Sequence, residues 1–297
     1  MAPVIAVFTK NRTNPAYTAA RLGADRVAAR LGARVVHYVP DKPDDIAEQR
    51  ALVERAIAER PDAAVFVPVH ATEMNGSARG LNAAGIPVVN YLNRLDQGKF
   101  VTYVGSDDYR LARDIAAFLF QRIGGKGDIV ILEGVPAAVT SQERLRGFRD
   151  AARDSPGIRI AASRAADYQR ETARRVTAEL LAGLSRVDGI LCANDVMALG
   201  AIEALEAAGR RIPLVGVNAI PEAIAAIKSG SLLATVDFDA MAISGIATEA
   251  AVRHLRGERV PREILLPVQI VDASNFRAWD LPFEARECPK WEDVVKG

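Results

Sequence analysis

The sequence predicts an α/β protein built from two similar domains, each a parallel sheet with helices wound on both faces. Short apolar runs rich in β-branched residues alternate with amphipathic stretches along most of the 297 residues, a pattern typical of parallel βαβ units. The strand pattern restarts after "VGSDD" (104–108). "RLGADRVAARLGARVV" (21–36) and "RLRGFRDAARDSPGIRI" (144–160) each lead from a helix through glycine into a strand, a weak internal repeat that favours two domains.

The first half of the chain contains five predicted strands. They are short, β-branched and almost continuously apolar, as expected for strands covered on both faces. Their ranges are 4–8, 34–39, 63–69, 87–92 and 101–105. Helical stretches separate them, for example 44–59, where Ile46, Val53 and Ile57 fall on one stripe. The spacing indicates right-handed crossovers between parallel strands.

The second half repeats this organisation. Its predicted strands are 128–132, 158–162, 188–193, 213–217 and 232–236, and its predicted helices are 141–153, 170–183, 195–208 and 221–228. A further helix (240–256) and a last strand in "EILLPVQIV" (263–271) follow. We expect this extra pair to return to the first domain, so that the chain passes between domains near 106, 237 and 269. The predicted lobes are therefore 1–106 plus 238–268, and 107–237 plus 269–297.

Composition and charge exclude several classes of protein. With 49% hydrophobic and 25% charged residues, the chain has an ordinary globular composition. Its 38 basic residues balance 37 acidic ones, so we expect no nucleic-acid partner. No run of 18 apolar residues is present. Because the chain enters a strand at once, we expect either a cytosolic protein or one whose signal peptide has been removed.

Polar side chains gather where the predicted strands end. Those segments read "TKNRTNPAY", "NYLNR", "VTSQER", "ADYQR", "CAND" and "GVNA". In parallel sheets ligands bind beyond the carboxyl ends of the strands. The set is rich in Asn and Arg, includes two tyrosines, and is poor in His, Cys and paired carboxylates. Asn and Arg can bind hydroxyl groups while an aromatic ring covers a sugar face, so the set indicates an uncharged polyol as ligand.

Seven motifs in order resemble one known family. They are "TNPAY", "GIPVVNYLNR", "VGSDDYRLARDIA", "TSQERLRGF", "ANDVMALGAIEAL", "LVGVNAIPEAIAAIKSG" and "LLATV". Together they make residues 3–272 similar to the ribose-type periplasmic sugar-binding proteins that serve ABC importers. The resemblance implies two lobes joined by a three-strand hinge, the type I periplasmic binding protein fold, with the sugar in a cleft and hinge closure on binding.

The resemblance also implies partners and a compartment. It implies a monomeric, non-enzymatic solute-binding protein that captures a monosaccharide or polyol and presents it to a membrane permease. It implies no cofactor and no metal. The implied compartment is the periplasm, with the signal peptide removed from this chain.

Carried over by motif, nine residues form the expected ligand site. They are Asn14, Tyr17, Asn93 and Arg94 from the first lobe, Arg144, Tyr168, Asn194 and Asn218 from the second, and Phe238 at a hinge position. The strand-four position stays open, since Asn90 or Leu92 could replace Asn93. Ribose binders typically carry Asp where Asn93 and Asn218 stand, and an aromatic residue is common at Ala16, so these departures favour a ligand other than ribose.

Two polar residues follow the buried strand in "GILCANDVMALG" (189–200). We expect Asp195 to be the N-cap of the next helix, because a carboxylate is favoured there by the helix dipole. That assignment leaves Asn194 to contact the ligand. Arg144 lies early in a helix, where its charge is unfavourable, so we expect it to have a specific partner.

The sequence argues against an enzyme and leaves one other class of function open. An enzyme of this fold would need a phosphate-binding glycine motif or a nucleophile with its base. No "GxGxxG" follows a strand, and no "GxxxxGK[ST]" or Ser-His-acid set is visible. The other alternative is a cytosolic sugar sensor, or the ligand-binding core of a regulator similar to the lactose repressor. Those regulators carry an N-terminal helix-turn-helix, for which we expect no room here.

Overall fold

The structure is a computed structural model that describes residues 2–295. The chain forms two compact units. Unit 1 comprises Met1–Ser106, Phe238–Pro267 and Phe283–Gly297, and unit 2 comprises Asp107–Asp237 and Val268–Pro282. Within residues 2–295, no helix has both the length and the apolar character that crossing a bilayer requires.

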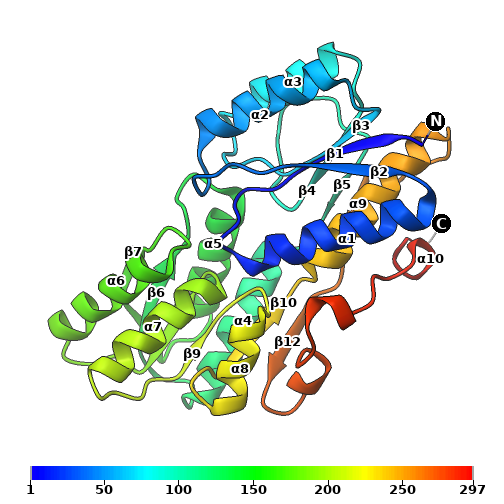
Figure 1. The fold of residues 1–297 in the computed structure, drawn as a ribbon. Coiled ribbons are helices and arrows are strands. Elements are labelled where there is room, and N and C mark those ends of the chain that lie inside the picture. Colours follow the sequence, from blue (N-terminus) through cyan, green and yellow to red (C-terminus); the bar gives the residue numbers. More distant parts are fainter. Residues whose placement is uncertain (1, 296–297) are drawn as a thin grey trace. The chain divides into compact units, whose positions relative to one another are not determined.

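Unit 1 is a six-stranded parallel sheet between helices (Figure 1). Its strands in spatial order are β11 (Glu263–Leu265), β5 (Tyr103–Gly105), β4 (Val88–Tyr91), β3 (Ala63–Phe66), β1 (Val4–Phe8) and β2 (Arg34–Tyr38). Its helices are α1 (Pro15–Leu31), α2 (Ile46–Glu59), α3 (Asn75–Ala83), α9 (Ala240–Leu255) and α10 (Trp291–Val294). Helices α1 and α9 pack so closely that a Cβ on Gly23 would lie 2.1 Å from the Met241 carbonyl oxygen.

Unit 2 has the same plan (Figure 1). Its strands in spatial order are β12 (Gln269–Asp272), β10 (Ala234–Asp237), β9 (Leu214–Val215), β8 (Gly189–Cys192), β6 (Gly127–Glu133) and β7 (Ile158–Ala165). Its helices are α4 (Asp108–Arg122), α5 (Val139–Arg153), α6 (Arg170–Gly183), α7 (Asp195–Ala207) and α8 (Pro221–Ser229). Only β12 is antiparallel to its neighbour. The predicted fold class, two doubly wound parallel-sheet lobes, is confirmed.

The predicted last strand is two strands in the structure. Residues 263–265 form β11, which pairs in parallel with β5 of unit 1, whereas 269–272 form β12, which pairs with β10 of unit 2. Pro267 stands between them. Because proline has no backbone N–H, it interrupts the ladder where the chain leaves one sheet for the other.

The C-terminal segment divides between the units. Residues 276–278 form a 3₁₀ turn (η1) on unit 2, where Trp279 Nε1 donates to Asp237 Oδ2 at 2.6 Å. A second 3₁₀ turn (η2, Phe283–Ala285) and α10 belong to unit 1. There Arg26 of α1 donates to the carbonyl oxygens of Glu284 and Arg286. Residues 283–295 therefore belong to unit 1, whereas the expected second lobe included all of 269–297.

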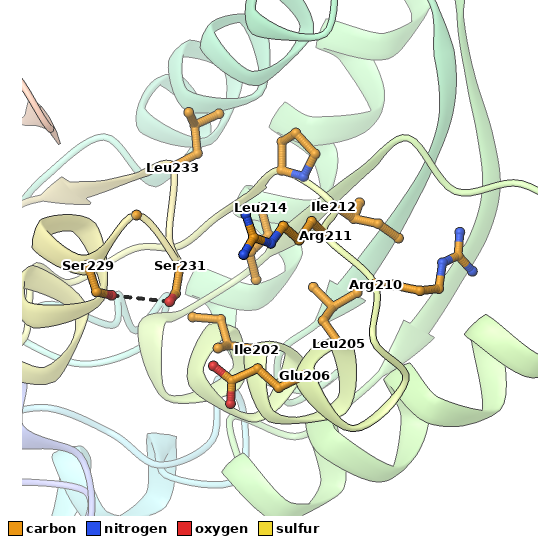
Figure 2. Close-up of a pocket in the computed structure, with 12 residues that line it drawn as sticks. Ile202, Leu205, Glu206, Arg210, Arg211, Ile212, Leu214, Ser229, Ser231 and Leu233 are labelled. Carbon is orange, nitrogen blue, oxygen red and sulfur yellow. Dashed lines mark hydrogen bonds between the residues drawn. The ribbon is translucent and has the colours of Figure 1, made fainter.

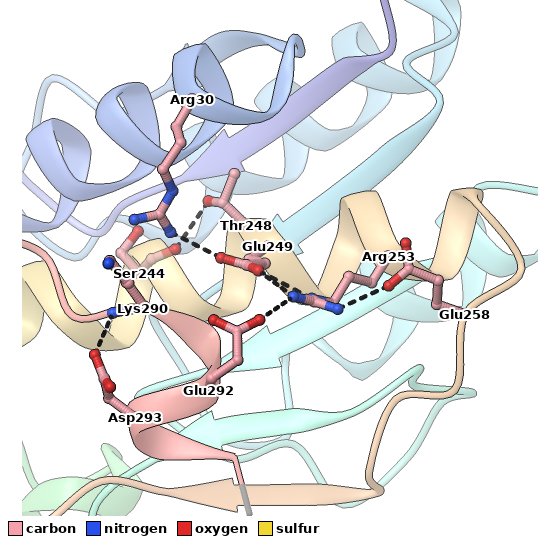
Figure 3. Close-up of polar contacts among 9 residues, drawn as sticks. All are labelled: Arg30, Ser244, Thr248, Glu249, Arg253, Glu258, Lys290, Glu292 and Asp293. Atoms are coloured by element: carbon pink, nitrogen blue, oxygen red, sulfur yellow. Dashed lines mark hydrogen bonds and ion pairs between the residues drawn. The ribbon is translucent and has the colours of Figure 1, made fainter. Parts of the chain in front are cut away.

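A polar cluster fastens α10 to the rest of unit 1 (Figure 3). Glu249 of α9 is buried, and it accepts hydrogen bonds from Arg30 at 2.8 Å and from Arg253 Nε at 2.9 Å. Arg253 also contacts Glu292 at 3.0 Å, and its guanidinium lies 4.7 Å from the Trp291 ring centroid. One arginine thus connects α9 with the C-terminal helix.

Replacing Arg253 by methionine should lower the free energy of unfolding by about 1–2 kcal/mol, since it removes a charged partner of a buried carboxylate and a cation–π contact. Urea denaturation measures this loss. The matched control is Arg175→Met, whose ion pair with Glu179 lies on the surface of unit 2 and should contribute less than about 0.5 kcal/mol. Equal losses in the two variants would contradict a fastening role for Arg253.

Candidate ligand-binding site

The carboxyl ends of neighbouring parallel strands in unit 2 bring four predicted site residues to one edge of the sheet. Strands β9, β8, β6 and β7 are adjacent and parallel. Asn218 follows β9, Asn194 follows β8, Arg144 lies in α5 after β6, and Tyr168 follows β7. Parallel strands collect their following loops at the same edge, so these residues occupy one end of unit 2.

Asn194 is buried and caps α7. Its Oδ1 accepts the backbone N–H of Met197 at 2.9 Å. Its Nδ2 is buried and has no hydrogen-bond partner within residues 2–295. The prediction that Asp195 caps this helix and leaves Asn194 uncommitted is therefore wrong. The oxygen of the Asn194 amide is used by the helix, and only its nitrogen is left as a donor.

Asp195 has a different role, in a buried network. Its Oδ1 accepts from the Thr235 hydroxyl at 2.7 Å, and its Oδ2 accepts from the Ile220 N–H at 3.1 Å. Burial raises the pKa of Asp195 to about 7, although these two hydrogen bonds act in the opposite direction. The carboxylate thus ties the start of α7 to strand β10 and to the start of α8.

Asn218 lies in a turn of unusual backbone conformation. Its φ is 125° and that of Ala219 is 51°, a region that residues other than glycine rarely adopt. The Ala219 N–H donates to Thr235 Oγ1 at 3.3 Å, so the Asp195–Thr235 pair supports this turn. The Asn218 Oδ1 is buried and has no hydrogen-bond partner among the described residues. Asn194 and Asn218 therefore present one buried donor and one buried acceptor from adjacent strands.

Arg144 is buried and held in place. Its Nε donates to Asp108 Oδ1 at 2.8 Å, and its NH1 donates to the Ala193 carbonyl at 2.8 Å. Burial raises the pKa of Asp108, against the opposing effect of the Arg144 charge. The specific partner expected for Arg144 thus includes a carboxylate 36 residues earlier. Contact with the Ala193 carbonyl also joins Arg144 to the residue before Asn194.

Tyr168 packs against the end of β6. Its backbone has a φ of 59°, and its hydroxyl lies 3.3 Å from Thr140 Oγ1. A Cβ on Gly134 would lie 2.2 Å from the Tyr168 ring. Glycine at 134 therefore lets the half-buried ring approach the backbone, which fixes the position of the ring at this edge.

In unit 1, Asn14 caps α1. Its Oδ1 accepts from the Ala16 N–H at 3.0 Å, and its own N–H donates to Asn11 Oδ1 at 3.0 Å. Pro15 occupies the first helical position, as is common at helix starts. Tyr17 is half-buried in the first turn of α1. The two residues share one helix start, and their ligand contacts stay predictions.

The loop after β4 uses its polar side chains for internal contacts. Asn93 is buried, with Nδ2 3.3 Å from the Pro68 carbonyl oxygen. Asn90 donates to the Phe66 and Asn93 carbonyls and accepts from the Leu95 N–H. Half-buried Leu92 has a φ of 56°. The choice among Asn90, Leu92 and Asn93 as ligand residue stays open.

Arg94 has partners within unit 1, and Phe238 belongs to the same unit. Arg94 forms an ion pair with Glu263, and its guanidinium lies 3.8 Å from the Tyr103 ring centroid. Phe238 follows β10 at the start of the second unit 1 segment and is buried. As site residues both stay predictions.

Sequence reasoning missed Asp108, Thr140 and Thr235, which support the predicted residues. The early helical position of Arg144 predicts a partner for its charge, but the sequence does not identify that partner as Asp108. Nothing in the local sequence indicates that Thr235, 40 residues away, would bond to Asp195.

The described residues show no group of three or more His, Cys, Asp and Glu side chains that could hold a metal ion. Cys192 and Cys288 are free thiols. Burial raises the pKa of both thiols, which makes reactive thiolates unfavourable.

The sequence and the fold are similar to those of known proteins. Residues 5–259 match the family described as periplasmic binding protein domain. A ribose import binding protein of Bacillus subtilis is 32% identical over 90% of this chain and 85% of its own length. A periplasmic solute-binding protein from Actinobacillus succinogenes, solved with D-allose, is 31% identical with a TM-score of 0.88 and covers 93% of this chain and 99% of that one. A solute-binding protein from Bacillus halodurans, solved with myo-inositol, is 26% identical with a TM-score of 0.86 over 94% and 97% of the two chains.

Proposed function

Because the chain belongs to the periplasmic binding protein family, a family of non-enzymatic solute binders, we propose that it captures a monosaccharide or related polyol for the permease of an ABC importer. Similar proteins are described as binding ribose, D-allose and myo-inositol. These ligands are neutral and carry many hydroxyl groups. The proposed compartment is the periplasm, and the proposed form is a monomer.

The observation that supports this function most is the buried donor and acceptor at the end of unit 2. The Asn194 Nδ2 and the Asn218 Oδ1 have no partner within residues 2–295. Leaving such groups unpaired costs about 1–3 kcal/mol each. A hydroxyl can accept from one amide and donate to the other, so a polyol satisfies both groups. A carboxylate could satisfy only the donor.

The remaining predicted residues fit the same ligand class. Arg144 is fixed by Asp108 and by the Ala193 carbonyl, so little side-chain entropy is lost on binding. The Tyr168 ring provides an aromatic surface for the apolar face of a sugar ring. Micromolar affinity requires about 8 kcal/mol, which a few charge-assisted and neutral hydrogen bonds plus ring burial can supply. We propose Asn14, Tyr17, Asn93, Arg94 and Phe238 as further contacts from unit 1.

A thermal-shift panel tests the proposed function. D-Ribose, D-allose, D-arabinose, xylitol and myo-inositol are each added to the full chain. A ligand at 100 times its dissociation constant should stabilise the protein by about 2.7 kcal/mol, and we expect at least one member to raise Tm. The double variant Asn194→Ala/Asn218→Ala is the control for nonspecific solute effects and should show no specific shift. If no monosaccharide or polyol raises Tm, the proposal fails.

A further inference from the structure

Unit 2 has a hollow of about 520 Å³ where α7 and α8 end and β9 and β10 begin (Figure 2). Helix α7 is followed by Gly209 with a φ of 61°, and α8 is followed by Gly230 with a φ of 81°. Such left-handed glycines reverse the chain after a helix. The hollow therefore lies at the amino ends of the strands, opposite to the edge that holds Asn194 and Asn218.

The floor of the hollow is apolar and its rim is polar. The apolar lining residues are Ile202, Leu205, Ile212, Pro213, Leu214 and Leu233. Ser229 and Ser231 stand on one side, with their hydroxyls 3.1 Å apart. The volume falls within the range of small-molecule sites. A branched aliphatic group matches this floor.

Acidic and basic side chains line the same hollow without forming ion pairs with each other. Glu206 lies in the last turn of α7, where the negative end of the helix dipole disfavours a carboxylate. Arg210 and Arg211 follow it. Within residues 2–295, no ion pair or side-chain hydrogen bond involves these three side chains.

Charged side chains on the neighbouring surface form ion pairs, unlike the charged side chains that line the hollow. Lys228 of α8 pairs with Asp280, and Arg170 pairs with Glu203. In Figure 2 the Glu206 carboxylate and the Arg211 guanidinium lie on opposite sides of Ile202 and Leu205, while Arg210 points away from these side chains. Glu206 and Arg211 therefore offer an acceptor and a fork of donors to one bound molecule.

We propose that this hollow binds a small zwitterion, an α-amino acid with an apolar side chain. The carboxylate of the ligand faces Arg211, whose guanidinium can donate two parallel hydrogen bonds. The ammonium group faces Glu206 and the carbonyl end of α7, which favours a cation. The aliphatic side chain covers the apolar floor. A ligand of a single charge would leave either Glu206 or Arg211 without a partner.

Isothermal titration of the full chain with L-leucine tests the proposal, with and without a saturating concentration of the panel member (D-ribose, D-allose, D-arabinose, xylitol or myo-inositol) that raises Tm most. Leucine should bind in both conditions. Glu206→Gln and Arg211→Gln should each weaken binding at least tenfold, whereas Arg277→Gln, at an exposed arginine of η1, should leave it unchanged. The compounds 4-methylpentanoate and 3-methylbutylamine, which lack the ammonium and the carboxylate respectively, should bind at least tenfold more weakly than leucine.

Three results would overturn the proposal. The first is no leucine binding up to millimolar concentration. The second is leucine binding that saturating sugar abolishes, which would assign leucine to the sugar site. The third is 4-methylpentanoate binding as tightly as leucine and equally well to Glu206→Gln, which would make the hollow a site for anions alone.

Discussion

Asn194→Ser is expected to bind the sugar roughly 10- to 100-fold more weakly than the wild type while keeping nearly the same stability without ligand. The serine hydroxyl can still accept the Met197 N–H, which Asn194 Oδ1 now accepts, because serine is a good N-cap. It cannot replace the Asn194 Nδ2, which has no partner within residues 2–295. Losing one hydrogen bond at a buried site costs about 1–3 kcal/mol.

Two alanine variants separate capping from ligand binding. Asn194→Ala removes both functions and should lose about 0.5–2 kcal/mol of stability as well as sugar affinity. Asp45→Ala is the matched control, since Asp45 caps α2 in unit 1 by accepting the Glu48 N–H at 2.9 Å. It should lose similar stability with unchanged affinity. Titration calorimetry and urea denaturation measure both quantities, and wild-type affinity in Asn194→Ser would exclude Asn194 as a ligand residue.

The fold could be predicted because its signal is local and repeated. Strand β1 (4–8) and helix α6 (170–183) have the predicted bounds, since apolar runs and amphipathic stripes encode them directly. Helix α3 shows where this fails, and no helix was assigned there. It contains Gly76 and Gly80, and its start at Met74 has no side-chain cap. Packing against α2 and β4 stabilises it instead.

The sequence predicts which residues stand at the strand ends, but it does not predict how their side-chain atoms bond. The sequence identifies which strand ends carry amide side chains, because this requires only the positions of the strands along the chain. It does not show that Asn194 caps α7 and that Asp195 bonds to Thr235 and Ile220. Both residues are acceptable N-caps, so the choice between them is made by tertiary partners 25 and 40 residues away.

Replacing Asp195 by alanine should have the largest effect on stability, a loss of about 2–5 kcal/mol. The change leaves the buried Thr235 hydroxyl and the Ile220 N–H without their acceptor. It also removes support for the turn at Asn218, which Thr235 holds through Ala219, so sugar affinity should fall together with stability. Asn194→Ser, in contrast, should lose affinity alone.

The Asp195 carboxyl should also make the free energy of unfolding depend on pH, and its burial determines the direction of this dependence. The folded-state pKa of Asp195 is about 7, and its ordinary value is 3.8, so the folded protein binds a proton more tightly than the unfolded chain between these values. The contribution of this raised pKa to the free energy of unfolding is fully present below about pH 4. It is lost as pH rises toward 7, by up to about 1.4 kcal/mol per pH unit. Nearby Asp237 acts in the same direction by raising this pKa.

Asp195→Asn isolates this contribution, since asparagine keeps an acceptor for Thr235 or Ile220 but does not titrate. Its free energy of unfolding, measured in urea at pH 5, 6, 7 and 8, should decline less between pH 5 and 7 than that of the wild type. The other carboxyl groups are common to both proteins, so their effects cancel in the difference. Parallel pH profiles would show that Asp195 is ionised throughout, in which case the Thr235 and Ile220 hydrogen bonds outweigh the cost of burying the charge.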